Sequence, residues 1–400
     1  MQLKILAFTY LALLLLAPCA GACQRQPQPA VNCSSTVTSA FDNHGRLWLA
    51  YTVDDQIWIV ASADLGQSFT QPVAVNHHPE SISARGENRP KLIVNDHHVL
   101  VSWARSGSKR FTADIRFSAS RDGGKTFSEP RTLNRDGLEI GHSFNEMVID
   151  SHQRLHIAWL DGRERHAAAA SGESFTGSSL FYTWSDDWGE QFANETSLSQ
   201  HTCECCRLAM TTAPDADPWI SWRQIDPSRG VRDHALARIN QAEAALRVLP
   251  LSNENWRIDG CPHHGPDLTM DTAHQVHAVW FSGDEQQGGL WYRHIDTTKS
   301  TLPMSPPQRF ATLDQQAAHP QVISVGDQVV RAWSAYDGES NLIYTQTSSD
   351  GGKTWSNRQT QLRSQGAIDY PFLISDGDTV YLSWLTTAEG YRLVALKQPG

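Results

Sequence analysis

The sequence lacks any excess of basic charge, and it has only one long apolar stretch. Its 43 Asp and Glu residues outnumber 33 Lys and Arg residues, giving a formal net charge of −10. No basic run is present of the kind that follows a phosphate backbone, so we expect no nucleic-acid partner. After residue 22, no apolar segment approaches the roughly 20 residues that a membrane helix needs. Membrane contact is therefore expected only through the N-terminus.

The first 22 residues have the features of an export signal. Lys4 supplies the positive charge, an apolar stretch too short to span a membrane follows, and small residues precede Cys23. Cleavage by either signal peptidase would leave Cys23 first. We predict that residues 23–30, with two prolines, form a tether, and that Cys23 is either lipidated or free. The expected location is the bacterial cell envelope, lipid-anchored or periplasmic or secreted; an uncleaved anchor is the alternative.

A short pattern, Ser-x-Asp-x-Gly-x-(Thr/Ser)-aromatic, recurs along the chain. Such residues suit a tight hairpin, because Asp bonds backbone amides two residues on and Gly takes positive φ. Three copies fit well and a fourth has Gln191 in place of the hydroxyl residue. The aspartates are Asp64, Asp122, Asp187 and Asp350. Their spacings of 58, 65 and 163 residues predict one regular repeat of about 54 residues.

This pattern resembles the Asp-box, or bacterial neuraminidase repeat, of the sialidase-like β-propellers. The resemblance covers nearly the whole chain after residue 33. It implies architecture more specifically than function, because such propellers include hydrolases, lectin-like binders and assembly factors.

Seven short strands with alternating apolar residues end in Trp or Tyr. They are predicted at 47–51, 99–103, 155–159, 219–222, 276–280, 329–333 and 380–384. Other β-rich runs precede and follow them. Four antiparallel strands repeated in this way are typical of propeller blades. We therefore predict an all-β, seven-bladed β-propeller over residues 31–400; six blades, as in the sialidases, is the alternative.

The ends of the repeats indicate how the ring closes and where a site can lie. The last repeat stops after its third strand, so residues near Val31 are expected to supply the outer strand. The Ala-rich segment 239–248 is predicted to be a hairpin rather than a helix, because a hairpin keeps the period of the repeat.

In a propeller, the starts of first strands and the ends of second strands share one face. That face carries a dense set of polar residues, and we predict that it is functional.

Cysteine gives the sharpest functional signal. All five cysteines beyond the signal region are expected at starts of first strands, on the channel face. Consecutive repeats begin with Cys203-Glu204-Cys205-Cys206 and Cys261-Pro262-His263-His264. In an extended segment Cys203 and Cys205 project to the same side. Thiolates with an imidazole suit Cu(I) or Zn(II). The alternatives are a disulfide from Cys261 to Cys205 or Cys206, and a redox-active thiol pair.

A hydrolase site is implied by the family resemblance. Sialidases hold a substrate carboxylate with three arginines, and use a tyrosine nucleophile activated by a glutamate and an aspartate as acid/base. The residues that could take these roles are Arg89, Arg163 and Arg223, with Tyr370 or Tyr336, Glu146 and Asp161. The sialidase Arg-Ile-Pro motif is represented only by Asn88-Arg89-Pro90, after the first Asp-box. Asp161 and Arg163 can equally form a salt bridge at the end of a strand.

Three functions follow, in order of preference. The first is a Cys/His site on the channel face for a thiophilic metal, copper ahead of zinc, with a metal ion or small polar ligand as partner. The second is an exo-sialidase-type glycoside hydrolase. The third is a binding or assembly propeller with a disulfide-braced rim and an envelope protein as partner.

Overall fold

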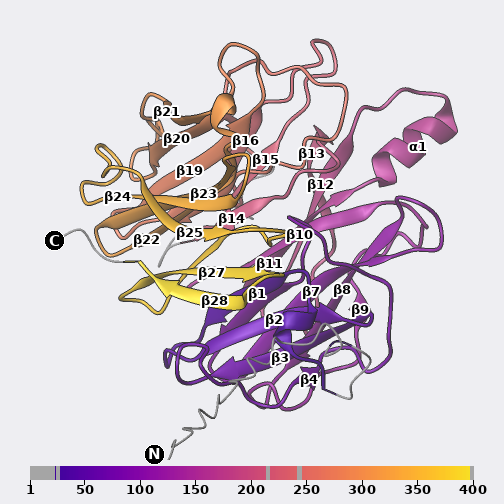
Figure 1. Cartoon of the computed structure of the whole chain (residues 1–400). Coiled ribbons are helices and arrows are strands. Elements are labelled where there is room, and N and C mark those ends of the chain that lie inside the picture. Colours follow the sequence, from indigo (N-terminus) through magenta and orange to yellow (C-terminus); the bar gives the residue numbers. More distant parts are fainter. Residues whose placement is uncertain (1–22, 24–27, 213–216, 241–245, 397–400) are drawn as a thin grey trace, which may run out of the picture.

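The chain forms a ring of seven antiparallel sheets (Figure 1). The computed structural model describes Cys23 and residues 28–212, 217–240 and 246–396. In six of the sheets the strands are paired in chain order, from the channel outward, and the second sheet differs only by one short extra strand. Neighbouring first strands contact one another, and the first strand of the last blade contacts that of the first blade. The predicted seven-bladed β-propeller is therefore confirmed, and the six-bladed alternative is excluded.

The blades contain four strands each, except the last. The first strands are β1 (Val37–Phe41), β6 (Lys91–Asn95), β10 (His142–Ile149), β14 (Ala209–Thr211), β18 (Asp267–Met270), β22 (Ala318–Val325) and β26 (Phe372–Ser375). The second strands are β2 (Leu47–Val53), β7 (His98–Ser106), β11 (Leu155–Asp161), β15 (Trp219–Arg223), β19 (Gln275–Ser282), β23 (Gln328–Tyr336) and β27 (Val380–Thr386). The third strands are β3 (Gln56–Ser62), β8 (Ala113–Ser120), β12 (Ser178–Ser185), β16 (His234–Arg238), β20 (Gly289–Asp296), β24 (Asn341–Ser348) and β28 (Gly390–Ala395). The fourth strands are β4 (Val73–Ala74), β9 (Arg131–Thr132), β13 (Thr196–Thr202), β17 (Leu249–Pro250), β21 (Gln308–Thr312) and β25 (Gln359–Ser364). A short extra strand, β5 (Ile82–Ser83), pairs with the end of β7.

Tryptophans of the second strands fill the spaces between blades. Trp103 is fully buried against Ile57 and Ile59 of the preceding blade, and Trp159 is buried against Leu100 in the same way. A large ring at one fixed place in each repeat buries much apolar surface between adjacent sheets. Packing between blades therefore explains why Trp recurs at one place in each repeat of the sequence.

The Asp-boxes form the turns between third and fourth strands. Ser62 Oγ donates to Asp64 Oδ1 (2.7 Å) and accepts from the Gly66 amide (2.8 Å). Asp64 in turn accepts from the Ser68 amide (2.8 Å). In the looser copy Ser185 Oγ still donates to Asp187 (2.7 Å) and the Gln191 amide donates to Asp187 (2.9 Å), and only the hydroxyl bond that Ser68 makes to Asp64 is missing. The boxes are therefore structural turns, as their chemistry indicates.

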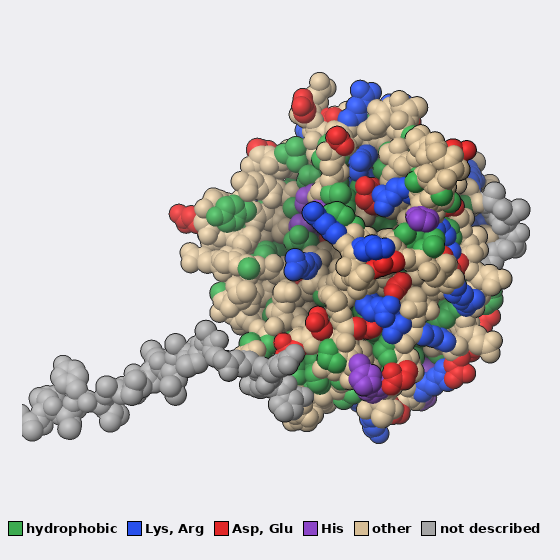
Figure 2. Space-filling view, turned by 90° about the vertical axis from the view of Figure 1, so that its right-hand side faces the viewer, with side chains coloured by type: hydrophobic (Ala, Val, Ile, Leu, Met, Phe, Trp, Pro, Cys, Tyr) green, Lys and Arg blue, Asp and Glu red, His purple; other side chains and the backbone are tan. Residues whose placement is uncertain are grey.

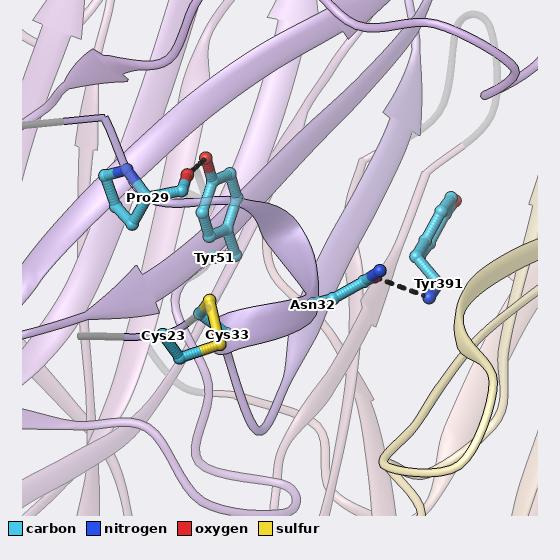
Figure 3. Close-up of a disulfide and its surroundings, with 6 residues drawn as sticks. All are labelled: Cys23, Pro29, Asn32, Cys33, Tyr51 and Tyr391. Carbon is cyan, nitrogen blue, oxygen red and sulfur yellow. Dashed lines mark hydrogen bonds between the residues drawn. A yellow bond between two sulfur atoms is a disulfide. The ribbon is translucent and has the colours of Figure 1, made fainter. Parts of the chain in front are cut away.

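The N-terminal residues close the ring beside the three-stranded last blade (Figure 3). Residues Val31–Cys33 form a 3₁₀ turn next to β28, where the Tyr391 amide donates to Asn32 Oδ1 (3.0 Å). They do not form the expected outer strand. Pro29 is buried, and its carbonyl accepts from Tyr51 Oη (2.7 Å). The end of the predicted tether is thus packed on the propeller.

Cys23 and Cys33 form a disulfide (Figure 3). Cys33 was expected at the channel mouth with the other cysteines, but it lies in the 3₁₀ turn that contacts β28, the third strand of the last blade. A sulfur in a disulfide cannot also carry a thioether-linked lipid, so lipidation of Cys23 and this disulfide exclude each other. The predicted signal, residues 1–22, lies outside the described residues.

One helix interrupts the blades. The helix α1 (Arg163–Ser171) lies between β11 and β12 and projects from the ring (Figure 1). None of its residues is buried. The predicted hairpin at 239–248 is consistent with the antiparallel pairing of β16 and β17, although residues 241–245 lie outside the described part.

None of the described helices has the length and apolar character to cross a bilayer. On the face in Figure 2, basic and acidic side chains are interspersed rather than gathered by sign.

Candidate metal centre and channel mouth

Three buried cysteines lie together at the start of the fourth blade. Cys203, Cys205 and Cys206 follow β13, and the Cys203 amide donates to the carbonyl of Arg223 at the end of β15 (2.9 Å). The chain turns at residues 204–205 instead of staying extended. Because of this turn, Cys203 Sγ lies 3.7 Å from Cys205 Sγ and 3.3 Å from Cys206 Sγ. Thiolates on one tetrahedral ion with bonds of about 2.3 Å lie about 3.8 Å apart. The three sulfurs are thus spaced nearly as ligands of a single ion.

The next blade adds two exposed side chains that could act as ligands. The sulfurs of Cys205 and Cys261 and a ring nitrogen of His263 lie within 4.8 Å of one another. Cys261 and His263 are exposed, whereas Cys205 is buried. His263 has a positive φ of 53°, a conformation that non-glycine residues rarely adopt outside special sites. The structure therefore brings together Cys203, Cys205, Cys206, Cys261 and His263 from two blades.

The thiols are free and sit beside guanidinium charge. The predicted disulfide from Cys261 to Cys205 or Cys206 is absent, because all four of these cysteines are unpaired. Arg232 Nη1 donates to Cys203 Sγ (3.6 Å) and to the carbonyl of Gly260 (3.0 Å). Hydrogen bonds from Cys205 and Cys206, with help from the charge of Arg223, lower the pKa of Cys203. A thiolate in this cluster is therefore stabilised before any ion is bound.

His264 and Arg223 have other partners. His264 stacks on Phe281 (4.1 Å between ring centres) and lies 4.5 Å from the His319 ring, so the prediction that it joins the cysteines was wrong. Arg223 donates to the carbonyls of Arg232, His264 and Phe281. This arginine therefore braces the two cysteine segments, and it is buried, with only 2% of its surface exposed.

A charged network fills the channel mouth beside His264. Glu87 accepts from His319 Nδ1 (3.1 Å) and from the Gly265 amide (2.9 Å), and lies 3.5 Å from Arg207 Nη1. Burial alone would raise the pKa of Glu87, but the charge of Arg207 and the bond from His319 hold it well below its usual range. Tyr370 stacks on His319, with 3.5 Å between ring centres. Glu87, His264 and His319 also have ligand atoms within 4.8 Å of one another.

Only half of the predicted hydrolase residues meet. Arg89, Glu146 and Tyr370 line one small cavity of about 30 Å³ at the channel mouth. Arg89 is bound to Asp369 through Nη2 and Oδ1 (2.6 Å), and Glu146 to Lys91 (2.7 Å). The guanidinium of Arg89 is therefore already neutralised by a buried carboxylate.

Asp161 and Arg163, two of the remaining hydrolase residues, belong to a separate cluster. Asp161 accepts from Arg163 Nη2 (2.8 Å), and Arg163 also contacts Glu195. His142 Nε2 lies 3.5 Å from Asp161 and 3.1 Å from Asp136. Asp161 and Arg163 thus form a salt bridge at the end of β11, which was the predicted alternative to a catalytic role. Since Arg89, Arg163 and Arg223 are each bound to different partners, the structure does not support the expected three-arginine carboxylate site.

Sequence reasoning missed the residues that fill the channel. Glu87, Arg207, Asp267 and Gln321 line the mouth cavity, and Asp267 also lines a larger channel cavity of about 270 Å³. Burial raises the pKa of Asp267 to about 6, although Arg207 opposes this. Their positions in the sequence could have indicated them, because Asp267 begins β18 and Arg207 directly follows Cys206.

Comparison with known proteins identifies the fold alone. No protein-family model and no curated sequence matches the chain. A polysaccharide lyase of family PL25, an ulvan lyase solved with -[GlcA(1-4)Rha3S]-, has a TM-score of 0.55 and 13% identity, covering 90% of this chain and 93% of its own. The GH93 α-L-arabinofuranosidase of Fusarium graminearum, solved with arabinobiose, has a TM-score of 0.50 and 12% identity, covering 91% and 93%. The polysaccharide lyase Uly1 has a TM-score of 0.50 and 9% identity, covering 96% and 94%. The chain is therefore similar in fold to carbohydrate-active propellers.

Proposed function

We propose that this protein binds a thiophilic metal ion, copper(I) ahead of zinc(II), at the cysteine cluster on its channel face. The observation that supports this is the convergence of four free thiols and one imidazole from two consecutive blades. Soft thiolates select Cu(I) or Zn(II). Copper(I) is preferred because a buried thiolate set beside Arg223 and Arg232 carries little uncompensated negative charge once a monovalent ion is bound.

The test is the metal content of purified, tag-free protein. Wild type is expected to hold copper or zinc, and the double variant Cys203→Ser, Cys205→Ser is expected to lose it stoichiometrically. The Cys23→Ser, Cys33→Ser variant is the matched control, because it also removes two cysteines but leaves the cluster intact. Metal retained by the first variant, or absent from wild type even after loading, would overturn the proposal.

Metal binding is expected to add to a rigid framework rather than to create it. The three buried cysteines lie between complete sheets, unlike the ligands of a zinc finger, whose fold depends on its metal. The melting temperature of the metal-free Cys203→Ser, Cys205→Ser variant should therefore lie close to that of metal-free wild type.

We also propose that the protein is exported to the cell envelope. The Cys23–Cys33 disulfide supports an exported protein, because disulfides persist mainly in oxidising compartments. A periplasmic or secreted form fits this disulfide, whereas a lipid anchor at Cys23 needs the reduced sulfur. Mass spectrometry of the mature N-terminus distinguishes the two by the mass at Cys23.

A carbohydrate-active enzyme is the second candidate. Asp267, whose pKa burial raises to about 6, and Glu146 line the same channel cavity. Glycoside hydrolases use two carboxyl groups, of which the general acid has a raised pKa. Incubation with ulvan, arabinan and a fluorogenic sialoside tests this candidate. Cleavage that is lost in Asp267→Asn would support it. No turnover of the sialoside is expected, because the three candidate arginines are bound to separate partners.

A further inference from the structure

Two sets of possible ligands share one cysteine. The inner position consists of Cys203, Cys205 and Cys206, and the outer position of Cys205, Cys261 and His263; in each, the ligand atoms lie within 4.8 Å of one another. Cys205 belongs to both. A single ion bound at one position is therefore already held by one ligand of the other.

The two positions differ in access to solvent. Every residue of the inner position is buried, with Cys203 and Cys206 each 1% exposed. Cys261 and His263 at the outer position are exposed. An ion from solution can reach the exposed Cys261 and His263 directly, whereas the inner sulfurs are buried.

The two positions also differ in ligand type and charge. The inner position offers three sulfurs, with Arg232 bonded to Cys203 and the buried Arg223 nearby. The outer position offers two sulfurs and one imidazole. A soft monovalent ion prefers the set richer in thiolate, and the neighbouring guanidinium groups offset its negative charge. The inner position is thus the more stable one for Cu(I).

We infer that copper(I) enters at the outer position and passes to the inner position by ligand exchange on Cys205. This inference rests on the proposed metal-binding function. During the transfer, bonds from copper to Cys261 sulfur and His263 nitrogen break, and bonds to Cys203 and Cys206 sulfurs form. Any proton still on Cys203 or Cys206 is released as copper binds; the freed Cys261 thiolate takes up one, and a second goes to solvent. Copper stays in the +1 state throughout, so no oxidant or reductant is needed. The suitable donor is a copper(I)–thiolate complex.

The experiment follows loading of anaerobic, reduced, metal-free protein from the copper(I)–glutathione complex. The double variant Cys261→Ser, His263→Ala should load at least about tenfold more slowly than wild type, yet reach the same final stoichiometry of inner copper. Cys206→Ser should load rapidly but bind at least about 100-fold more weakly, since loss of a ligand exceeds the usual effect of an outer partner. His166→Ala on α1 changes an exposed histidine elsewhere and should behave as wild type.

X-ray absorption spectra provide a readout independent of rate. Wild type should show copper bound by sulfur alone, and Cys206→Ser should show a nitrogen ligand. Equal effects of the outer and inner variants on both rate and affinity would overturn the two-position scheme while leaving metal binding intact. Absence of copper from wild type would instead overturn the proposed function itself. The outer variant involves only exposed side chains, so the rate test does not depend on folding of the Cys206 variant.

Discussion

At the scale of single residues, His263 and His264 show why composition alone does not assign ligands. Both belong to the predicted Cys/His motif, but only His263 lies near the cysteines. The left-handed backbone at His263 changes the direction of the chain, and His264 joins His319 in the channel. The residue types alone do not indicate that His263 has a positive φ. The cysteine site could be predicted because the spacing of the blades places the two cysteine segments side by side, whereas local backbone conformation determines which of the two histidines lies near them.

Asp267 allows a pH prediction at the same scale. Its folded-state pKa of about 6 lies above the usual value, so burial of the charged form destabilises the fold as pH rises from about 4 to 6. Asp267→Asn removes this cost and should raise stability at pH 7 by up to about 2–3 kcal/mol. At pH 4, where Asp267 is protonated in the folded state, the variant and wild type should be nearly equal. Urea unfolding at the two pH values measures the difference; equal effects at both would contradict the assignment.

At the scale of elements, strands were predicted well and the helix was not. Alternating apolar residues and repeated Trp residues identify β2, β7, β11, β15, β19, β23 and β27, because packing between blades requires them. Helix α1 buries no residue, so its sequence has no apolar face from which a periodic pattern could be detected. Only the Ala-rich run 167–170 favours a helix there.

The Asp-box carboxylates should contribute to the loss of stability in acid. The pKa of Asp350 is lowered to about 2, mainly by hydrogen bonds from the hydroxyl and amide of Thr354. An acid with a lowered folded-state pKa stabilises the fold above its unfolded value and loses this effect as pH falls from about 4 to 2. Asp350→Asn should therefore flatten the decline in melting temperature over this range.

Asp378→Asn is the control for this acid effect. Asp378 is an exposed aspartate outside the boxes. If both variants decline as steeply as wild type, the box carboxylates do not carry the acid sensitivity.

At the scale of the whole molecule, the ring is joined where its first and last blades meet. The buried pair of Arg89 and Asp369 links the start of β6 to the start of β26, and Arg89 Nη1 also donates to the carbonyl of Val37 (3.0 Å). Three blades thus share one guanidinium. Sequence predicted that the termini meet, but not this pair, because the two residues lie 280 positions apart.

Arg89→Ala should destabilise the ring strongly. It leaves the Asp369 carboxylate buried without its cation, which costs about 3–5 kcal/mol. Arg363→Ala removes an exposed arginine that pairs with Asp337 (2.7 Å), and should cost about 1 kcal/mol or less. Chemical unfolding of both variants gives the comparison. A small effect of Arg89→Ala would show that ring closure does not depend on this pair.

The central claim, a metal site built from free thiols of two blades, is tested most directly by measuring bound metal and free thiols together. One sample is kept as purified and one is reduced and stripped with a chelator. The account predicts bound copper or zinc in the first sample, and in the second the four free thiols of Cys203, Cys205, Cys206 and Cys261, besides any released from the Cys23–Cys33 disulfide. No bound metal, with these four thiols appearing only after reduction, would contradict it and indicate a disulfide-braced rim.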